Sequence, residues 1–383
     1  MLLRVPDYYK HFQCIAAKCK NSCCIGWEID IDEDTFDYYQ NIPGKFGEKL
    51  RHNMTNEKEN HFHLKGNHCP FLNQNNLCDI CMELGEESLC EICTEYPRFT
   101  TEYANTVEKC LGLSCEEACR IIIENKNKVV LEDMYFEEEE EKIPQREKQA
   151  IVCVETVRKT SLKILQNRKD GIQKRLQKYL SFCYEVQTVR NHSERFLTEV
   201  EIEDIFRKVD GLEPDSFSVK IDFFQNFLNR LRTYEELEIL NETWPAYLKK
   251  MKQLADMYNK EEVLQNIVPK ISGMKQELEI EFEQLAVYFV IRYAMKGVSD
   301  GQIASYAGFL ILSLLFIRDM FLTKIQLKDD ILTKEERIDM IRLYSSEVEH
   351  SKENMEFLYK SILFEPCFSK ENLLENIICF LEI

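Results

Sequence analysis

The pattern of apolar and polar positions divides the chain into two parts. From about residue 145 onward, apolar side chains return every three or four positions, as in Ile151, Val154 and Val157. This is the period of an amphipathic α-helix. Further ranges with helical spacing are 281–298, 303–322 and 334–349, and two final helices follow them. We therefore predict an all-helical body over residues 149–383.

The first part lacks this long helical period and contains only short patterned segments. Trp27, Ile29 and Ile31 alternate with acidic residues, which indicates a short half-buried strand. Asp34 is a candidate N-cap for the helix expected to follow it. These short pieces predict a small irregular lobe with short strands over residues 1–125.

An acidic segment separates the two parts. The run Glu137–Glu141 is followed by Lys142 and Pro144. A block of like charge beside a proline resists packing, so we predict a linker over residues 126–148. The expected fold class is mainly α, with the small lobe followed by the helical body.

Charge and hydropathy exclude two classes of partner. The net charge is −18, and the phosphate backbone of a nucleic acid would be repelled by it. The longest uncharged apolar stretch, Ile303–Ile317, falls short of the roughly 18–20 residues that a membrane span needs. We predict that it is a buried core helix. The opening MLLRVPDYYKHF has no apolar export signal, which predicts a cytoplasmic protein.

Cysteine is concentrated in the predicted lobe. Twelve of the 16 cysteines lie in the first 119 residues. Such clustering has three physical causes, namely disulfides, a metal site or redox chemistry. Disulfides are the weakest of these because thiols stay reduced in the cytosol. A metal that holds the thiolates deprotonated explains the clustering best.

The spacing of the cysteines leaves the metal open. Cys78-x2-Cys81 and Cys90-x2-Cys93 have the spacing of two zinc knuckles. The adjacent pair Cys23-Cys24 is unusual for a tetrahedral zinc site and suits a larger iron–sulfur cluster, in which separate irons each take a thiolate. Both zinc and iron–sulfur remain alternatives at this point.

Four cysteine-bearing blocks carry a resemblance to a known family. In order they are CIAAKCKNSCCIGWEIDID, CPFLNQNNLCDI, LGEESLCEICTEYPR and EKCLGLSCEEACR. Together they resemble the flagellin lysine-N-methylase (FliB) family, which is similar to a wider group named for a C-x2-C-x2-C-C zinc- or iron-chelating domain. FLNRLRTYEELEILNETWPAYL and EQLAVYFVIRYAMKG fall where that family has its helical C-terminal part.

The resemblance implies a set of metal ligands. The cysteines that match the family pattern are Cys14, Cys19, Cys23, Cys24, Cys69, Cys78, Cys93 and Cys115. The other cysteines of the lobe are Cys81, Cys90, Cys110 and Cys119. At these four positions the family usually has small or polar residues, and we expect them to pack as small hydrophobic side chains.

The resemblance also implies an activity. It is the transfer of a methyl group from S-adenosylmethionine to surface lysines of flagellin, in an enzyme that depends on an iron–sulfur cluster, with a 4Fe–4S type favoured and zinc as the alternative. No motif identifies catalytic or donor-binding residues, because the glycines never form G-x-G and the C-x3-C-x2-C spacing is absent. The alternative function is a non-enzymatic metal- or redox-sensing interaction protein.

Overall fold

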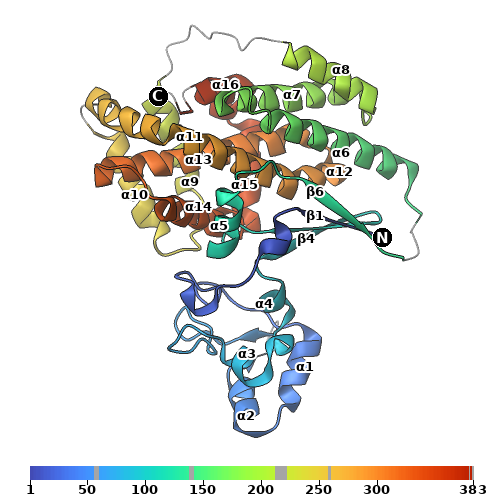
Figure 1. Ribbon diagram of the computed structural model, residues 1–383, viewed down its shortest axis with the longest axis vertical. Helices are drawn as coiled ribbons and strands as arrows, with labels where there is room; N and C mark the ends of the chain where they lie inside the picture. The colour runs from blue at the N-terminus through green and yellow to red at the C-terminus, as the bar shows by residue number, and fades with distance from the viewer. Residues whose placement is uncertain (56–59, 138–141, 212–221, 258–259, 379, 382–383) are drawn as a thin grey trace.

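The chain folds into a cysteine-rich lobe and a larger helical body, with a small sheet at the side of the body that faces the lobe (Figure 1). The computed structural model describes residues 1–55, 60–137, 142–211, 222–257, 260–378 and 380–381. The expected fold class, mainly α with a small cysteine-rich lobe that carries short strands, is confirmed. Within the described residues, no helix combines the length and apolar character needed to cross a lipid bilayer.

The lobe has a hydrophobic core of its own. Its elements are η2 (Ala16–Lys18), α1 (Glu33–Asn41), α2 (Gly44–His52), β2 (Met54–Thr55), β3 (His61–Phe62), α3 (Asp79–Leu84), η3 (Glu86–Ser88) and α4 (Glu91–Glu95). The preceding η1 (Tyr9–His11) packs against the core of the helical body. Tyr39, Leu50, Phe62 and Phe71 are fully buried in this core, and Phe62 stacks edge-on against Phe71 at 5.1 Å between ring centroids. The lobe is therefore ordered by apolar packing as well as by its cysteines.

The segment around Trp27 differs from its prediction. Ile29 and Ile31 are buried, as the alternation indicated. The segment nevertheless forms only an isolated bridge, from Asp30 to His61, in place of a strand. The prediction of a strand is wrong because β3, the partner segment, has only two residues, so the pairing does not extend beyond one bridge.

The start of α1 also differs from its prediction. Asp32, and not Asp34, is the N-cap of this helix. Its carboxylate accepts a hydrogen bond of 2.9 Å from the backbone N–H of Thr35, and this satisfies a donor that the first turn leaves free. Both aspartates fit the cap by residue type, so only the backbone geometry decides between them.

Four strands form the sheet between lobe and body. They are β1 (Leu2–Pro6), β4 (Arg98–Tyr103), β5 (Thr106–Leu111) and β6 (Leu131–Tyr135). Their order is β4–β5–β1–β6, with β1 parallel to β5 and the other pairs antiparallel. β6 lies within the segment 126–148 that we predicted as a linker, so part of that segment belongs to the sheet. The three domain boundaries themselves stay predictions.

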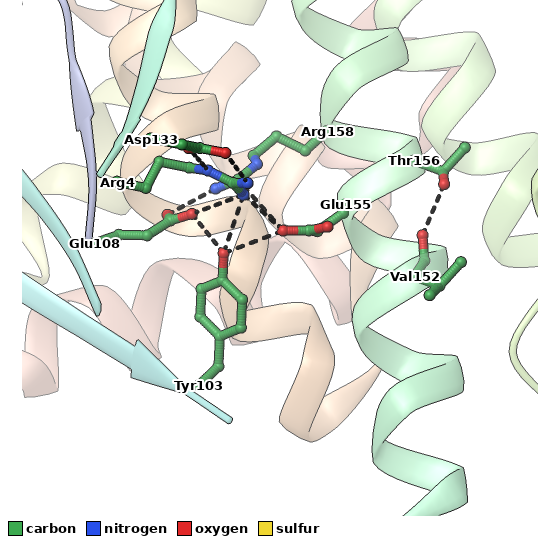
Figure 2. Close-up of polar contacts among 8 residues, drawn as sticks. All are labelled: Arg4, Tyr103, Glu108, Asp133, Val152, Glu155, Thr156 and Arg158. Carbon is green, nitrogen blue, oxygen red and sulfur yellow. Dashed lines mark hydrogen bonds and ion pairs between the residues drawn. The ribbon is translucent and has the colours of Figure 1, made fainter. Parts of the chain in front are cut away.

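A network of charged side chains fastens this sheet to the helical body (Figure 2). Arg4 of β1 contacts Asp133 of β6 and Glu155 of the body, each at 2.6 Å. Glu108 of β5 accepts a hydrogen bond of 2.7 Å from Arg158, whose side chain is only 3% exposed. Glu155 and Arg158 come from one helix, so three charges from three strands converge on one stretch of the body.

The helical body surrounds one long apolar helix. Its elements are α6 (Gln145–Leu165), α7 (Ile172–Ser193), α8 (Glu199–Asp210), α9 (Phe223–Glu235), α10 (Trp244–Ala255), α11 (Lys260–Tyr293), η4 (Ala294–Lys296), α12 (Gly297–Asp300), α13 (Ile303–Lys328), α14 (Lys334–Val348), α15 (Lys352–Phe364), η5 (Pro366–Phe368) and α16 (Lys370–Ile378). α13 is buried along almost its whole length, which confirms the predicted core helix. Its buried Asp319 is paired with Arg230 at 2.6 Å.

Candidate metal centre

The first group of candidate cysteines lies in a loop that folds back onto Cys69. The backbone N–H of Cys69 donates a hydrogen bond of 2.7 Å to the carbonyl of Cys24, and the N–H of Gly26 donates one of 2.8 Å to the carbonyl of Asn67. This pairing brings cysteines that are 45 positions apart in the sequence into contact (69 minus 24). The fold therefore joins the first and second cysteine blocks through main-chain bonds.

Three cysteines occupy helix N-caps. Cys78 precedes α3, Cys90 precedes α4 and Cys115 precedes α5 (Glu116–Glu124). Burial raises the pKa of Cys115 to about 11, and the backbone N–H groups of Ala118 and Glu117 oppose this shift. A helix N-terminus presents free N–H groups and a partial positive charge, which stabilise a thiolate or an anionic cluster.

The sulfur of Cys24 is the centre of the closest contacts. Hydrogen bonds from Cys23 and then Cys69 lower the pKa of the Cys24 thiol. The same bonds, together with burial, raise the pKa values of Cys23 and Cys69, which act as the donors. The thiols of Cys23 and Cys69 therefore both donate to the sulfur of Cys24. A cation that binds thiolates would take the place of those protons.

Further cysteines surround this contact group. Cys93 and Cys90 hydrogen-bond to each other, and this bond is the largest cause of the raised pKa of Cys93. Cys93 also interacts electrostatically with Cys24 and Cys23, and Cys23 interacts with Cys14 and Cys115. Burial raises the pKa values of Cys78 and Cys19, which interact with Cys24 and Cys14 respectively. Electrostatic interactions therefore link all eight candidate positions.

The four other cysteines of the lobe lie in different surroundings. Cys110 is buried with its sulfur 3.6 Å from the Tyr8 hydroxyl, and Cys119 is fully buried with its sulfur 3.9 Å from the carbonyl oxygen of Ile338. Both pack where the sheet and α5 meet the body. Cys81 is partly exposed on α3, whereas Cys90 belongs to the sulfur contacts through Cys93.

The chemistry of the donor set fits a thiophilic metal. Every cysteine among the described residues is a free thiol. Over the same residues, no three or more cysteine, histidine or carboxylate side chains are already arranged around a common metal position. The sulfur of Cys24 nevertheless contacts those of Cys23 and Cys69, and soft thiolate donors suit iron–sulfur clusters and zinc. The assignment of the eight cysteines as ligands stays a prediction.

A chain of polar contacts beside the cysteines was not foreseen from the sequence. The indole N–H of Trp27 donates a hydrogen bond of 2.6 Å to the carbonyl of Cys23, and the Trp27 and Tyr96 rings lie 6.0 Å apart. The Tyr96 hydroxyl is 3.3 Å from Ser114 Oγ, which is 2.8 Å from His350 Nε2. His350 comes from the helical body, 236 positions after Ser114. No local motif could have signalled this contact.

Comparison with known proteins supports the resemblance that the cysteine blocks carry. Residues 158–375 match the family described as FliB lysine N-methylase C-terminal domain. The flagellar biosynthetic protein FliU of Salmonella muenchen is 28% identical over 135 residues, which cover 33% of this chain and 79% of that protein. A lysine-N-methylase of Salmonella choleraesuis is 27% identical over 136 residues, and one of Salmonella typhimurium is 26% identical over 136 residues.

The length of chain that each match covers determines whether it establishes the family. The match to each Salmonella lysine-N-methylase covers 33% of this chain and 34% of the relative. No solved structure matches. The family match runs from α6 into α16 and spans most of the helical body. It covers more than half of the 383 residues, and the chain therefore belongs to the FliB lysine N-methylase family.

Proposed function

We propose that this protein is a protein-lysine N-methyltransferase that methylates surface lysines of flagellin, uses S-adenosylmethionine as donor and depends on a cysteine-ligated iron–sulfur cluster. The observation that carries the proposal is the family match over residues 158–375. The names of the relatives, a flagellar biosynthetic protein and two lysine-N-methylases, support the reaction and the substrate. Because flagellin is exported, the modification would take place in the cytoplasm before export.

The cysteine region supports the cluster in this proposal. Cys23, Cys24, Cys69 and Cys93 would hold it, since Cys24 contacts Cys23 and Cys69 and Cys93 interacts electrostatically with Cys23 and Cys24. When bound, such a cluster supplies an iron site able to bind a donor ligand or transfer an electron. Cys78 and Cys115 would lie beside it at helix N-termini, where backbone N–H groups stabilise negative charge.

The neighbouring residues support a reaction on an amine. A free lysine has a pKa of about 10.4, so the site must favour the neutral amine for attack on a methyl group. Tyr96, Ser114 and His350 place hydrogen-bonding groups in a partly buried position beside Cys115 and Cys23. Partial burial of the ring lowers the pKa of His350, so its imidazole is neutral near pH 7 and able to accept a proton or a hydrogen bond.

The decisive experiment combines metal analysis with a methylation assay. The protein is purified without oxygen, its iron, sulfide and zinc are measured, and its absorbance is recorded at about 400 nm. It is then incubated with purified flagellin and S-adenosylmethionine, and methyl-lysine is detected by mass spectrometry. We expect iron, sulfide and methylated flagellin.

Any different result contradicts one specific part of the proposal. Stoichiometric zinc without iron would exclude the cluster. Iron without methylation of flagellin would exclude the substrate and would favour the metal- or redox-sensing function. A flagellin whose lysines are replaced by arginine serves as the control, because it keeps the positive charge but lacks the reacting amine.

A further inference from the structure

A cleft lies between the cysteine-rich lobe and the edge of the sheet. Its volume is about 470 Å³. One wall carries Asp30, Asp32, Glu91 and Glu95 from the lobe, and the other is the start of β4. Ile92 of the lining precedes Cys93, so the cleft adjoins the candidate metal centre. Its position suits a substrate that must approach the cysteines.

The β4 wall of the cleft is a strand edge that no other described segment of the chain pairs with. β4 is the first strand in the order β4–β5–β1–β6, so β5 pairs with one side of it. The N–H of Gly112 donates to the carbonyl of Pro97, which places residues 97, 99, 101 and 103 in the hydrogen-bonded pairs of the ladder. In an antiparallel pair the alternate residues point their N–H and C=O groups away from the partner. Arg98 and Thr100 therefore present main-chain donors and acceptors to the cleft.

The lobe wall of the cleft is negatively charged. Burial opposes ionisation of Asp32, but hydrogen bonds from the N–H groups of Glu91 and Thr35 outweigh it and lower its pKa. Glu91 is exposed, and the part of the chain that the structure describes supplies no ion-pair partner for its carboxylate. Glu95 is paired with Lys109 at 3.0 Å. Arg98 is the one cation among the lining residues, and it lies over the ring of Phe12 at 5.1 Å.

We propose that this cleft binds an extended, lysine-bearing segment of the substrate polypeptide as an added strand along β4. The main chain of the segment would hydrogen-bond to Arg98 and Thr100, and its lysine side chains would face the carboxylates of the lobe. The strand edge gives affinity for any extended chain, and the charge selects lysine. This inference rests on the proposed lysine methyltransferase function and names the recognition site for its substrate.

The test measures binding without chemistry. The full-length protein, purified without oxygen, is titrated into a short fluorescein-labelled peptide in which lysine alternates with threonine, and fluorescence anisotropy gives the Kd. No methyl donor is present. We expect the lysine peptide to bind more tightly than a matched peptide with glutamate in place of lysine. Equal binding of the two peptides would overturn the proposal.

Two substitutions test the two walls separately. Glu91→Gln should raise the Kd about threefold, as expected for the loss of one exposed charge pair. The matched control is Glu48→Gln, an exposed glutamate of α2 on the same lobe but outside the cleft. Thr100→Pro removes an outward N–H without removing a ladder bond, and should raise the Kd about fivefold. Its control is Glu102→Pro, which removes the next outward N–H along β4, outside the cleft.

The outcomes separate this inference from the proposed function. An increased Kd in both cleft variants but in neither control supports the cleft. Equal effects of cleft and control substitutions would overturn it, even if flagellin is methylated normally. If the expected binding pattern appears but flagellin is not methylated, the cleft stands as a site for lysine-bearing chains and the methyltransferase function fails.

Discussion

His350 Nε2 lies 2.8 Å from Ser114 Oγ, and this contact joins the helical body to the residue that precedes Cys115. Ser114 is buried, whereas His350 is an exposed residue whose contact with Ser114 is partly buried. The ring of Tyr96 lies 6.5 Å from that of His350. The candidate metal centre is therefore supported from the body as well as from the lobe.

The first prediction concerns the pH dependence of this contact. Partial burial of its ring lowers the pKa of His350 below that of a free histidine, about 6.5. The unfolded chain therefore binds the proton more tightly, so the stability from neutral His350 is present above about pH 6.5 and is lost as the pH falls below that value. We expect the Tm to fall more between about pH 7.5 and about pH 5.5 in the native protein than in His350→Gln. Equal falls in the two proteins would contradict the prediction.

The second prediction concerns the ion pair between Arg158 and Glu108, both almost fully buried. Arg158→Met removes the cation and leaves the carboxylate buried, which should lower the free energy of unfolding by about 3 kcal/mol. Urea denaturation measures this change. The control is Arg207→Met, because both side chains of the Arg207–Glu203 ion pair are exposed. This substitution should lower the free energy of unfolding by less than about 0.5 kcal/mol. Similar costs in the two variants would show that burial does not determine the strength of the pair.

The third prediction distinguishes cysteines that bind metal from those that only pack. Cys24→Ser should remove most of the iron, because Cys24 contacts both Cys23 and Cys69 and a hydroxyl is a poorer ligand than a thiolate. Cys119→Ser should keep the iron and lower the free energy of unfolding by about 1 kcal/mol, because Cys119 is buried among apolar side chains. The iron content of both variants, prepared side by side without oxygen, tests this. Retention of iron in the first and loss in the second would reverse the assignment.

The fourth prediction concerns two glycines in helices. A Cβ on Gly308 of α13 would lie 2.6 Å from Cγ2 of Ile362, so Gly308→Ala should lower the free energy of unfolding by about 1 kcal/mol or more, despite the better helix propensity of alanine. A Cβ on Gly273 of α11 would meet no atom within 4 Å. Gly273→Ala should therefore raise the free energy of unfolding by about 0.5–1 kcal/mol. Thermal and urea unfolding measure both changes, and a stabilised Gly308→Ala would show that the two helices separate easily.

The sequence determined the helical body and the cysteine-rich character of the lobe. A period of three or four residues records which face of a helix is buried, so α13 and the neighbouring helices could be predicted from local pattern alone. The position of Cys115 at the N-cap of α5 is also local, because Cys115 directly precedes the first residue of that helix. Family membership likewise followed from ordered cysteine blocks and is confirmed by the match to the body.

Only the tertiary structure decided which groups meet. Cys24 contacts Cys69, and Ser114 contacts His350, through long-range pairing that no local pattern contains. β6 pairs with β1 although acidic residues border it. The sequence did not predict this pairing because β1 lies at the start of the chain, far from β6 in the sequence. Pairing between distant segments depends on the packing of the whole chain, whereas helical periodicity can be recognised within a few turns of sequence. This is why the body was predictable and the arrangement of the candidate site was not.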